Sequence, residues 1–320
     1  MLREACEEDG VLGPGILEDR RDADRIEEKE TRKNMKNETY KIQLAGSQPY
    51  AKLVTYIQDD SVEIGIADRP LVLVCPGGGY EFTSDREAEA LALQFLAMGY
   101  HSAVLRYSVA PAVFPTALSE LAYSVRLIRE HGEEWHVNPD QIIVLGCSAG
   151  GHLVASLGVF WNRDFLAKAL KAEGADHKLW RPDGMILCYP VITSGEFAHR
   201  GSIDSLMGDR EKEISEMLGA PALNAFSLET QVSGDTPPAF LWHTFTDDAV
   251  PVENSLMFVS ALRRAGVSAE LHIYPVGGHG LSLANRLTQG AGGSAVQKEC
   301  QSWINLAHTW IESQYVEKSV

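Results

Sequence analysis

A serine held between two glycines is the strongest chemical signal in this 320-residue sequence. The segment reads Gly146-Cys147-Ser148-Ala149-Gly150, and it directly follows the apolar run Ile142–Leu145 and precedes a helical pattern. A sharp strand–turn–helix junction of this kind, a nucleophile elbow, exposes the serine hydroxyl. Glycine is needed on both sides because side chains there would collide, and the turn directs the N-terminus of the next helix toward developing negative charge. The pattern therefore predicts that Ser148 is a nucleophile.

A serine nucleophile needs a base, and the base needs an acid that orients it. His279 lies between two glycines after the last apolar run, which suits a histidine on a loop that reaches over a sheet. Two adjacent aspartates, Asp247 and Asp248, follow the preceding run. Asp247 is the preferred acid because its distance to Val250-Pro251 matches a D-x-x-V-P pattern, and Asp248 would then cap a helix or loop. The chain order serine, aspartate, histidine is a known order of such triads.

A run of glycines after a different apolar run could bind a developing oxyanion. The segment reads Pro76-Gly77-Gly78-Gly79-Tyr80. Consecutive glycines leave backbone N–H groups unobstructed, and together with the N–H of Ala149 they could bind the oxyanion of a tetrahedral intermediate. A phosphate-binding loop and a plain flexible loop are the alternatives, but the Gly-Lys-Ser/Thr that a phosphate loop requires does not follow.

Other side chains near these loops support weaker hypotheses. Tyr80, Phe82 and Tyr107 follow predicted strands close to the expected pocket, so we interpret them as candidates for substrate binding, with aromatic core packing as the alternative. His152 and His243 are expected to pack or form hydrogen bonds locally, His243 in support of the acid loop.

Short apolar runs alternate with amphipathic helices and must position these residues. The apolar runs occupy residues 71–74, 102–105, 142–145, 185–188, 240–242 and 270–273. Each is typical of a parallel strand that is covered on both faces. Helices are expected at residues 117–130, 252–265 and 295–312, and an antiparallel edge hairpin at 41–44 and 51–57. The alternation predicts an α/β fold with a mostly parallel central sheet and helices on both faces.

The domain organisation follows from breaks in this pattern. Residues 1–38 are dense in charge of both signs and poor in large apolar residues, so we expect a flexible or loosely helical extension. Residues 39–320 are expected to form one domain. Within it, residues 193–238 interrupt the rhythm with several Gly, Ser and Pro residues, which predicts a small inserted cap over the strand ends.

Composition excludes several classes of function. The net charge is 28 − 44 = −16, and an acidic surface repels nucleic acid. The five cysteines are widely spaced without a C-x-x-C pair, which predicts neither a disulfide framework nor a zinc ribbon. Cys75, Cys147 and Cys188 lie in apolar runs and are expected to be buried. The segment His131–His136 fits neither H-E-x-x-H nor H-x-x-E-H, so we predict no metal site. The N-terminus lacks the pattern of a signal peptide and no apolar run could span a bilayer, so a cytoplasmic enzyme without a membrane partner is expected.

Taken together, the motifs resemble α/β-hydrolases of the acetyl esterase/lipase type, in the group that includes acetylxylan and feruloyl esterases. The resemblance covers roughly residues 40–315 and rests on Pro76–Tyr80, Gly146–His152, Trp242–Asp247 and Gly278–Gly280. By analogy with hormone-sensitive-lipase-like esterases, Gly78 and Gly79 would donate to the oxyanion with Ala149, and Tyr80 is a further candidate donor. Those esterases usually carry histidine before the three glycines. Pro76 stands there instead, so other hydrogen bonds must anchor the loop.

The resemblance implies a serine carboxylesterase that cleaves short-chain, especially acetyl, esters through an acyl-enzyme and needs no cofactor. Its partner would be a small-molecule ester, with an acetylated xylan-derived oligosaccharide as one candidate, and a homo-oligomer is left open. A serine peptidase and an arylformamidase-like amidase on the same fold are alternatives, but peptidases of the prolyl-oligopeptidase type usually carry a large β-propeller for which the chain has no room. A non-catalytic ligand-binding homologue usually lacks a triad residue, whereas Ser148, Asp247 and His279 are all present.

Overall fold

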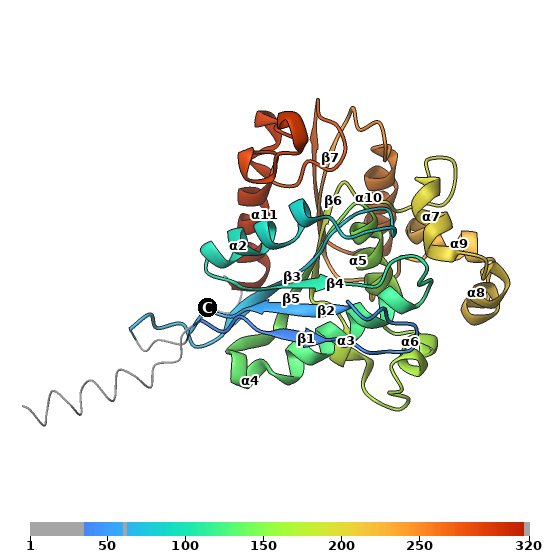
Figure 1. Cartoon of the computed structure of the whole chain (residues 1–320), viewed down its shortest axis with the longest axis horizontal. Coiled ribbons are helices and arrows are strands. Elements are labelled where there is room, and N and C mark those ends of the chain that lie inside the picture. Colours follow the sequence, from blue (N-terminus) through green and yellow to red (C-terminus); the bar gives the residue numbers. More distant parts are fainter. Residues whose placement is uncertain (1–34, 60–62, 317–320) are drawn as a thin grey trace, which may run out of the picture.

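An eight-stranded sheet is the centre of the fold in the computed structural model, which describes residues 35–59 and 63–316 (Figure 1). The strand order is β1-β2-β4-β3-β5-β6-β7-β8. The strands are β1 Thr39–Lys41, β2 Lys52–Tyr56, β3 Arg69–Cys75, β4 His101–Arg106, β5 Val137–Cys147, β6 Gly184–Cys188, β7 Ala239–Thr244 and β8 Ala269–Tyr274. The β1–β2 and β2–β4 pairs are antiparallel and the remaining pairs are parallel, as the sequence predicts.

Helices cover both faces of this sheet. In β3, Leu71 and Leu73 join one hydrophobic cluster, while Val72 and Val74 join the other, since successive side chains of a strand point to opposite faces. The first cluster packs under α3 (Thr116–Glu130), α5 (Ala149–Phe160) and α10 (Glu253–Ala265). The second packs under α2 (Glu89–Ala97) and α11 (Trp303–Ile311) (Figure 1). This two-sided burial explains why the central strands are continuous apolar runs.

Two expected elements differ from those in the structure. The sequence predicts a strand at 41–44, but β1 ends at Lys41 because the chain turns at residues 45–46, where the Leu44 N–H donates to the Ser47 hydroxyl at 3.0 Å. The sequence also predicts a helix over 295–312, but α11 begins only at Trp303. Ala295 has a φ of +62°, which an α-helix cannot hold, so the apolar spacing before Trp303 does not continue a helix.

The segment between β6 and β7 contains α7 (Arg200–Met207), α8 (Glu211–Leu218) and α9 (Ala222–Phe226), which lie together at one side of the molecule (Figure 1). Two further short helices, α4 (Gly132–Trp135) and α6 (Asp164–Ala169), follow α3 and α5 in the chain.

The structure describes only the last few residues of the charged N-terminal segment. Residues 1–34, most of the charged N-terminal segment and Cys6 with it, lie outside the described residues. The sheet edge includes a residue before the predicted start at 39, because Lys36 pairs with Ile57. Among the described residues we find no helix with the length and hydropathy that crossing a membrane requires.

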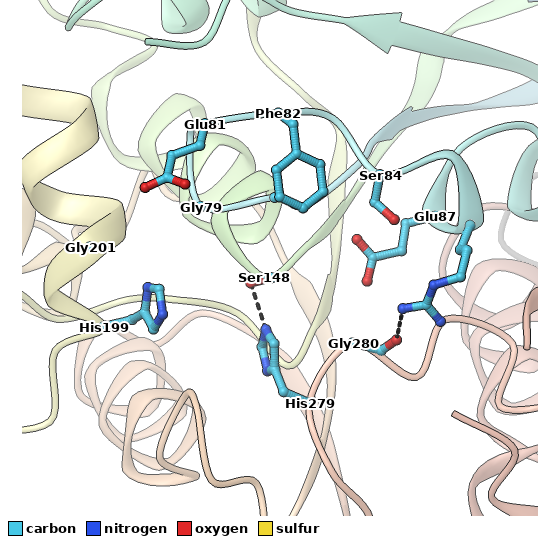
Figure 2. A pocket seen from close by; sticks show the side chains of 12 residues that line it. Gly79, Glu81, Phe82, Ser84, Glu87, Ser148, His199, Gly201, His279 and Gly280 are labelled. Atoms are coloured by element: carbon cyan, nitrogen blue, oxygen red, sulfur yellow. Dashed lines mark hydrogen bonds between the residues drawn. The ribbon is translucent and has the colours of Figure 1, made fainter. Parts of the chain in front are cut away.

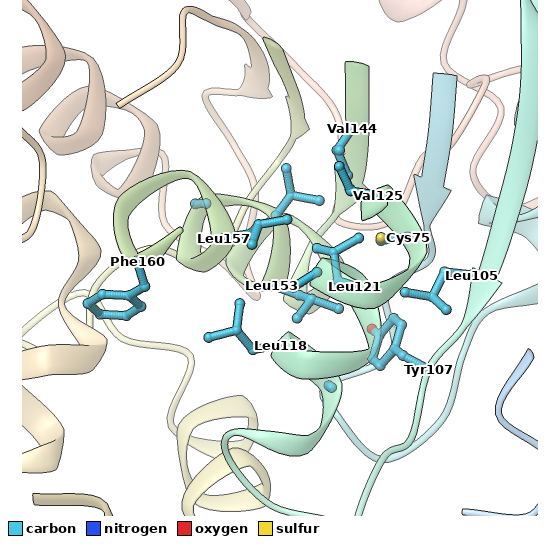
Figure 3. Packing of buried hydrophobic residues seen from close by; sticks show 14 of the residues in the cluster. Cys75, Leu105, Tyr107, Leu118, Leu121, Val125, Val144, Leu153, Leu157 and Phe160 are labelled. Atoms are coloured by element: carbon cyan, nitrogen blue, oxygen red, sulfur yellow. The ribbon is translucent and has the colours of Figure 1, made fainter. Parts of the chain in front are cut away.

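Helix α3 packs against α5 beneath the candidate nucleophile. One buried hydrophobic cluster contains Leu118, Leu121 and Val125 of α3 together with Leu153 and Leu157 of α5 (Figure 3). Because α5 starts directly after Ser148, this packing fixes the direction in which that helix leaves the sheet.

Shortening a side chain in this interface should therefore destabilise the fold. We expect Leu121→Ala, at a fully buried position, to lower the free energy of unfolding by about 2–5 kcal/mol, through lost apolar contact and a residual cavity. Urea denaturation followed by circular dichroism measures this. The matched control is Leu93→Ala on α2, where the side chain is 43% exposed and the change should stay near about 0.5 kcal/mol. Equal losses for the two variants would contradict this account of the core.

Candidate active site

The candidate residues lie at the carboxyl ends of parallel strands. Ser148 directly follows β5, and the glycine loop Gly77–Gly79 follows the neighbouring strand β3. Asp247 lies in the loop after β7, and His279 lies in the loop after β8. Parallel strands end at the same edge of a sheet, where α/β proteins bind their ligands. The fold thus brings together residues that are far apart in the sequence.

Ser148 occupies a strained turn between β5 and α5. Its φ of 54° and ψ of −119° lie outside the regions that residues other than glycine usually adopt. The turn is tight: a Cβ atom on Gly146 would lie 2.2 Å from the Gly150 carbonyl oxygen, and one on Gly150 would lie 2.2 Å from the Cys75 carbonyl oxygen. The backbone N–H of Ser148 donates to the Cys188 carbonyl at 3.0 Å, which ties the turn to β6. The two glycines are therefore required by close backbone contacts.

Ser148, His279 and Asp247 form a continuous chain of hydrogen bonds. The distance from Ser148 Oγ to His279 Nε2 is 2.7 Å (Figure 2), and the distance from His279 Nδ1 to Asp247 Oδ2 is 2.8 Å. With Nδ1–H donating to the carboxylate, Nε2 is left to accept the hydroxyl proton. Asp248 is exposed to solvent, so the structure brings Asp247 and not its neighbour to the imidazole.

The surroundings of Asp247 keep its carboxylate ionised. Burial alone would raise the pKa of Asp247, but hydrogen bonds from His243 and His279, the charge of His279 and the Val250 N–H together lower that pKa well below its ordinary value. Asp247 Oδ1 accepts the N–H groups of Ala249 at 3.0 Å and Val250 at 2.9 Å. These two bonds are the physical reason for the D-x-x-V spacing. His243 is buried behind the carboxylate and binds the Ser255 hydroxyl and the Val250 carbonyl, so it does support the acid loop.

The acid loop and the histidine loop are also bonded directly to each other. The hydroxyl groups of Thr244 and Thr246 each donate to the Gly277 carbonyl at 2.9 Å. The N–H of Gly277 donates in turn to the Thr246 hydroxyl oxygen at 2.9 Å. These bonds hold the carboxylate and the imidazole at a fixed separation before any substrate binds.

The glycine loop presents backbone N–H groups next to Ser148. Gly78 and Gly79 line the cavity that contains Ser148, and Gly78 has a φ of +132° that favours glycine. Ala149 is the first residue of α5, where an N–H has no acceptor within the helix. Within residues 35–59 and 63–316, no protein acceptor pairs with the N–H groups of Gly78, Gly79 or Ala149. These three groups are therefore available to a ligand oxygen.

The structure corrects two of the three aromatic candidates for substrate binding. Tyr80 and Tyr107 are buried and do not line the cavity, because they pack beneath the loop. The Tyr107 hydroxyl donates to the Pro76 carbonyl at 2.6 Å, and the Tyr80 hydroxyl lies 3.1 Å from His152 Nδ1. His152 is fully buried, and burial lowers its pKa to about 4, so it packs locally as the sequence predicts. Phe82 alone of the three lines the cavity, with 60% of its surface exposed.

The cavity above Ser148 has a volume of about 410 Å³ and is lined by both polar and apolar surface (Figure 2). Glycines form much of its wall, and Phe82 is its only large apolar side chain among the described residues. The remaining wall residues are Glu81, Ser84, Arg86, Glu87, His199 and the triad members Ser148 and His279. The wall thus offers a ligand both hydrogen-bonding groups and one exposed aromatic ring.

Several wall residues carry no sequence signal that would have identified them. Arg86 and Glu87 lie in the short 3₁₀ helix Asp85–Glu87, and their charges look like those of an ordinary exposed turn. His199 lies in the irregular stretch before α7, and only the fold brings it to the cavity. Burial and the nearby charge of His279 lower the pKa of His199. Among the described residues we also find no group of three or more His, Cys, Asp or Glu side chains placed to hold a metal ion.

Comparison with known proteins agrees with this fold and site. The BD-FAE family model matches residues 63–262. Endo-1,4-beta-xylanase B of Butyrivibrio fibrisolvens is 35% identical over 237 residues, which are 73% of this chain and 35% of that protein. An acetylxylan esterase of Xylanibacter ruminicola is 28% identical over 212 residues, or 65% of this chain and 40% of that protein. The chain thus spans well under half the length of these two curated relatives.

A solved structure gives a fuller match. The acetyl ester-xyloside bifunctional hydrolase of Caldicellulosiruptor lactoaceticus is 36% identical with a TM-score of 0.69, and the match covers 83% of this chain and 89% of that one. The carboxylesterase Cest-2923 of Lactobacillus plantarum is 27% identical with a TM-score of 0.72, over 88% of this chain and 98% of that one. The chain belongs to the BD-FAE family and has the α/β-hydrolase fold, as the sequence motifs predict.

Proposed function

We propose that this chain is a serine carboxylesterase that hydrolyses short-chain esters through an acyl-enzyme. The observation that carries the proposal is the hydrogen-bonded chain from Ser148 through His279 to Asp247, beside N–H groups with no protein acceptor. The relatives named above include proteins described as an acetylxylan esterase and a carboxylesterase, which supports ester hydrolysis in this chain as well.

The mechanism follows from the positions of these groups. His279 Nε2 removes the Ser148 proton while Oγ forms a bond to the ester carbonyl carbon, and the carbonyl π electrons move to oxygen. The oxyanion is stabilised by the N–H groups of Gly78, Gly79 and Ala149. The carbon–oxygen bond to the alcohol then breaks, and the leaving oxygen takes the proton from His279. Water deacylates the serine by the same route, and Asp247 orients and stabilises the imidazolium in both steps.

The cavity lining favours a small acyl group on a polar, hydroxylated alcohol. Glycines close to Ser148 leave room for an acyl chain, and Phe82 is the only large apolar side chain that the described part of the chain adds to the wall. Carboxylates, a guanidinium and an imidazole are typical partners of sugar hydroxyl groups, and Phe82 offers a ring on which a sugar face can stack. We propose an acetylated oligosaccharide of the xylan type as the substrate, in line with the names of the relatives. Residues 193–238 would act as the cap on the alcohol side, because His199 and Gly201 from this segment line the cavity.

Substitutions in the triad test the mechanism. We expect Ser148→Ala to abolish turnover of p-nitrophenyl acetate, with unchanged circular dichroism, because the nucleophile is lost. Asp247→Asn should lower kcat by about 10⁴-fold, because an amide in place of the carboxylate favours the wrong imidazole tautomer. Asp248→Asn is the matched control and should keep wild-type activity. If Asp248→Asn were the damaging change, the assignment of the acid would be wrong.

Competing substrates test the specificity. Acetate release from acetylated xylo-oligosaccharides should proceed with a higher kcat/KM than hydrolysis of the corresponding butyrates or of feruloyl esters. We expect Phe82→Ala to lower kcat/KM on the acetylated oligosaccharide by roughly fivefold, equivalent to about 1 kcal/mol of lost stacking. Ethyl acetate is the control substrate, since its alcohol is too small to stack on this ring, and its rate should not change. Equal kcat/KM values on all esters would refute the sugar preference.

A further inference from the structure

The glycine loop has an anchor that the sequence did not indicate. Pro76 stands where related esterases usually carry a histidine, so the loop must be held by other groups. In the structure the N–H of Gly77 donates to Glu87 Oε2 at 2.9 Å. Gly77 is tightly enclosed there, because a Cβ atom on it would lie 2.7 Å from Glu87 Oε2 and 2.9 Å from the Cβ of Ser148. The buried Glu87 carboxylate thus binds the loop, and Glu87 lines the same cavity as Ser148.

The second oxygen of the same carboxylate binds a buried tyrosine that directly follows β6. Glu87 Oε1 accepts the Tyr189 hydroxyl at 2.7 Å. Burial raises the pKa of Tyr189 well above its ordinary value, so the hydroxyl keeps its proton and can donate. Both partners of Glu87 are therefore donors, and each of the two carboxylate oxygens accepts one of them.

Tyr189 passes the connection on to the histidine loop. Its hydroxyl oxygen accepts the N–H of Ser282 at 2.8 Å, and its ring packs edge-on against the His279 imidazole with centroids 5.2 Å apart. The neighbouring Arg86 makes a second link to the histidine loop. Its guanidinium donates to the Gly280 carbonyl at 2.6 Å (Figure 2), and its backbone carbonyl accepts the Ser282 hydroxyl at 2.7 Å. The 3₁₀ helix Asp85–Glu87 is thus bonded to the loops on both sides of Ser148.

We propose that Glu87 is a positioning residue that, with Tyr189, holds the oxyanion loop and the histidine loop in one hydrogen-bonded unit. This inference rests on the proposed esterase function. Glu87 does not contact the reacting atoms in this assignment. It sets the position of the Gly78 and Gly79 N–H groups relative to His279. Because the oxyanion forms only as the reaction proceeds, Glu87 stabilises the transition state and not the bound substrate.

Kinetics of Glu87→Gln and Tyr189→Phe test the coupling. A glutamine oxygen can accept only one of the two donors and turns its amide N–H groups toward the other, while phenylalanine removes the shared hydroxyl. We expect each variant to lower kcat on p-nitrophenyl acetate by about ten- to a hundredfold, while KM stays within about threefold of wild type. This loss of kcat is no larger than the loss caused by removing one oxyanion donor. Because the two residues act as one unit, the double variant should be no slower than the slower single variant.

Glu89→Gln is the matched control. Glu89 lies two residues further along the chain and also accepts a tyrosine hydroxyl, that of Tyr56 at 2.8 Å, but it does not line the cavity. Its kcat should stay within about twofold of wild type. Unchanged kcat in Glu87→Gln and Tyr189→Phe, or losses that multiply in the double variant, would overturn the proposal, even if the melting temperature fell.

Amide hydrogen exchange provides a readout that does not depend on activity. Glu87→Gln should speed exchange in the segment 280–283, and Tyr189→Phe should speed it in the segment 77–80, although neither residue bonds directly to the backbone of the segment named for it. Exchange changes confined to the immediate neighbours of each substitution would contradict the coupling. If the two variants changed exchange as described but the wild-type protein failed to hydrolyse esters, the proposed function would fail while the link between the loops would stand.

Discussion

Parallel pairing of β3, β5, β7 and β8 with their neighbours is the constraint on which the site depends. Because these strands run in one direction, their carboxyl ends meet at a single edge, and the loops that follow them meet there as well. Ser148, Asp247 and His279 are far apart in the chain yet lie within hydrogen-bond distance of one another. Reversing one of these strands would carry its loop to the opposite edge and dismantle the site.

The loops at this edge are joined by hydrogen bonds that do not involve the reacting atoms. Thr244 and Thr246 bind the Gly277 carbonyl, which fixes the acid loop to the histidine loop. Glu87 and Tyr189 connect the glycine loop to the same histidine loop from the other side. Groups held in this way need little reorganisation when charge develops, and such preorganisation is a major source of electrostatic stabilisation in enzymes. The strained backbone of Ser148 is tolerated for the same reason, since β6 and α5 hold it on both sides.

Charge has different roles at the surface and in the site. The chain carries a net charge of −16, which disfavours polyanionic partners but places no limit on a neutral ester. In the site, the buried carboxylate of Asp247 is stabilised by backbone N–H groups and by two histidines, so it stays ionised next to the imidazole that it orients. The cavity wall adds polar groups of both signs, Glu81 and Arg86 among them, which can bind hydroxyl groups in several directions.

The sequence alone was sufficient for features that depend on local backbone chemistry. Glycines around Ser148 are imposed by a turn with no space for Cβ atoms, and the D-x-x-V spacing by a carboxylate that caps the N–H of Val250, so both patterns can be recognised without a structure. Only the tertiary structure decided which side chains face the cavity. Tyr80 and Phe82 are two residues apart, yet one ring is buried under the loop and the other lines the cavity, and Glu87 gains its partners from segments remote in sequence. Orientation of this kind depends on packing between distant segments, and no short stretch of sequence records it.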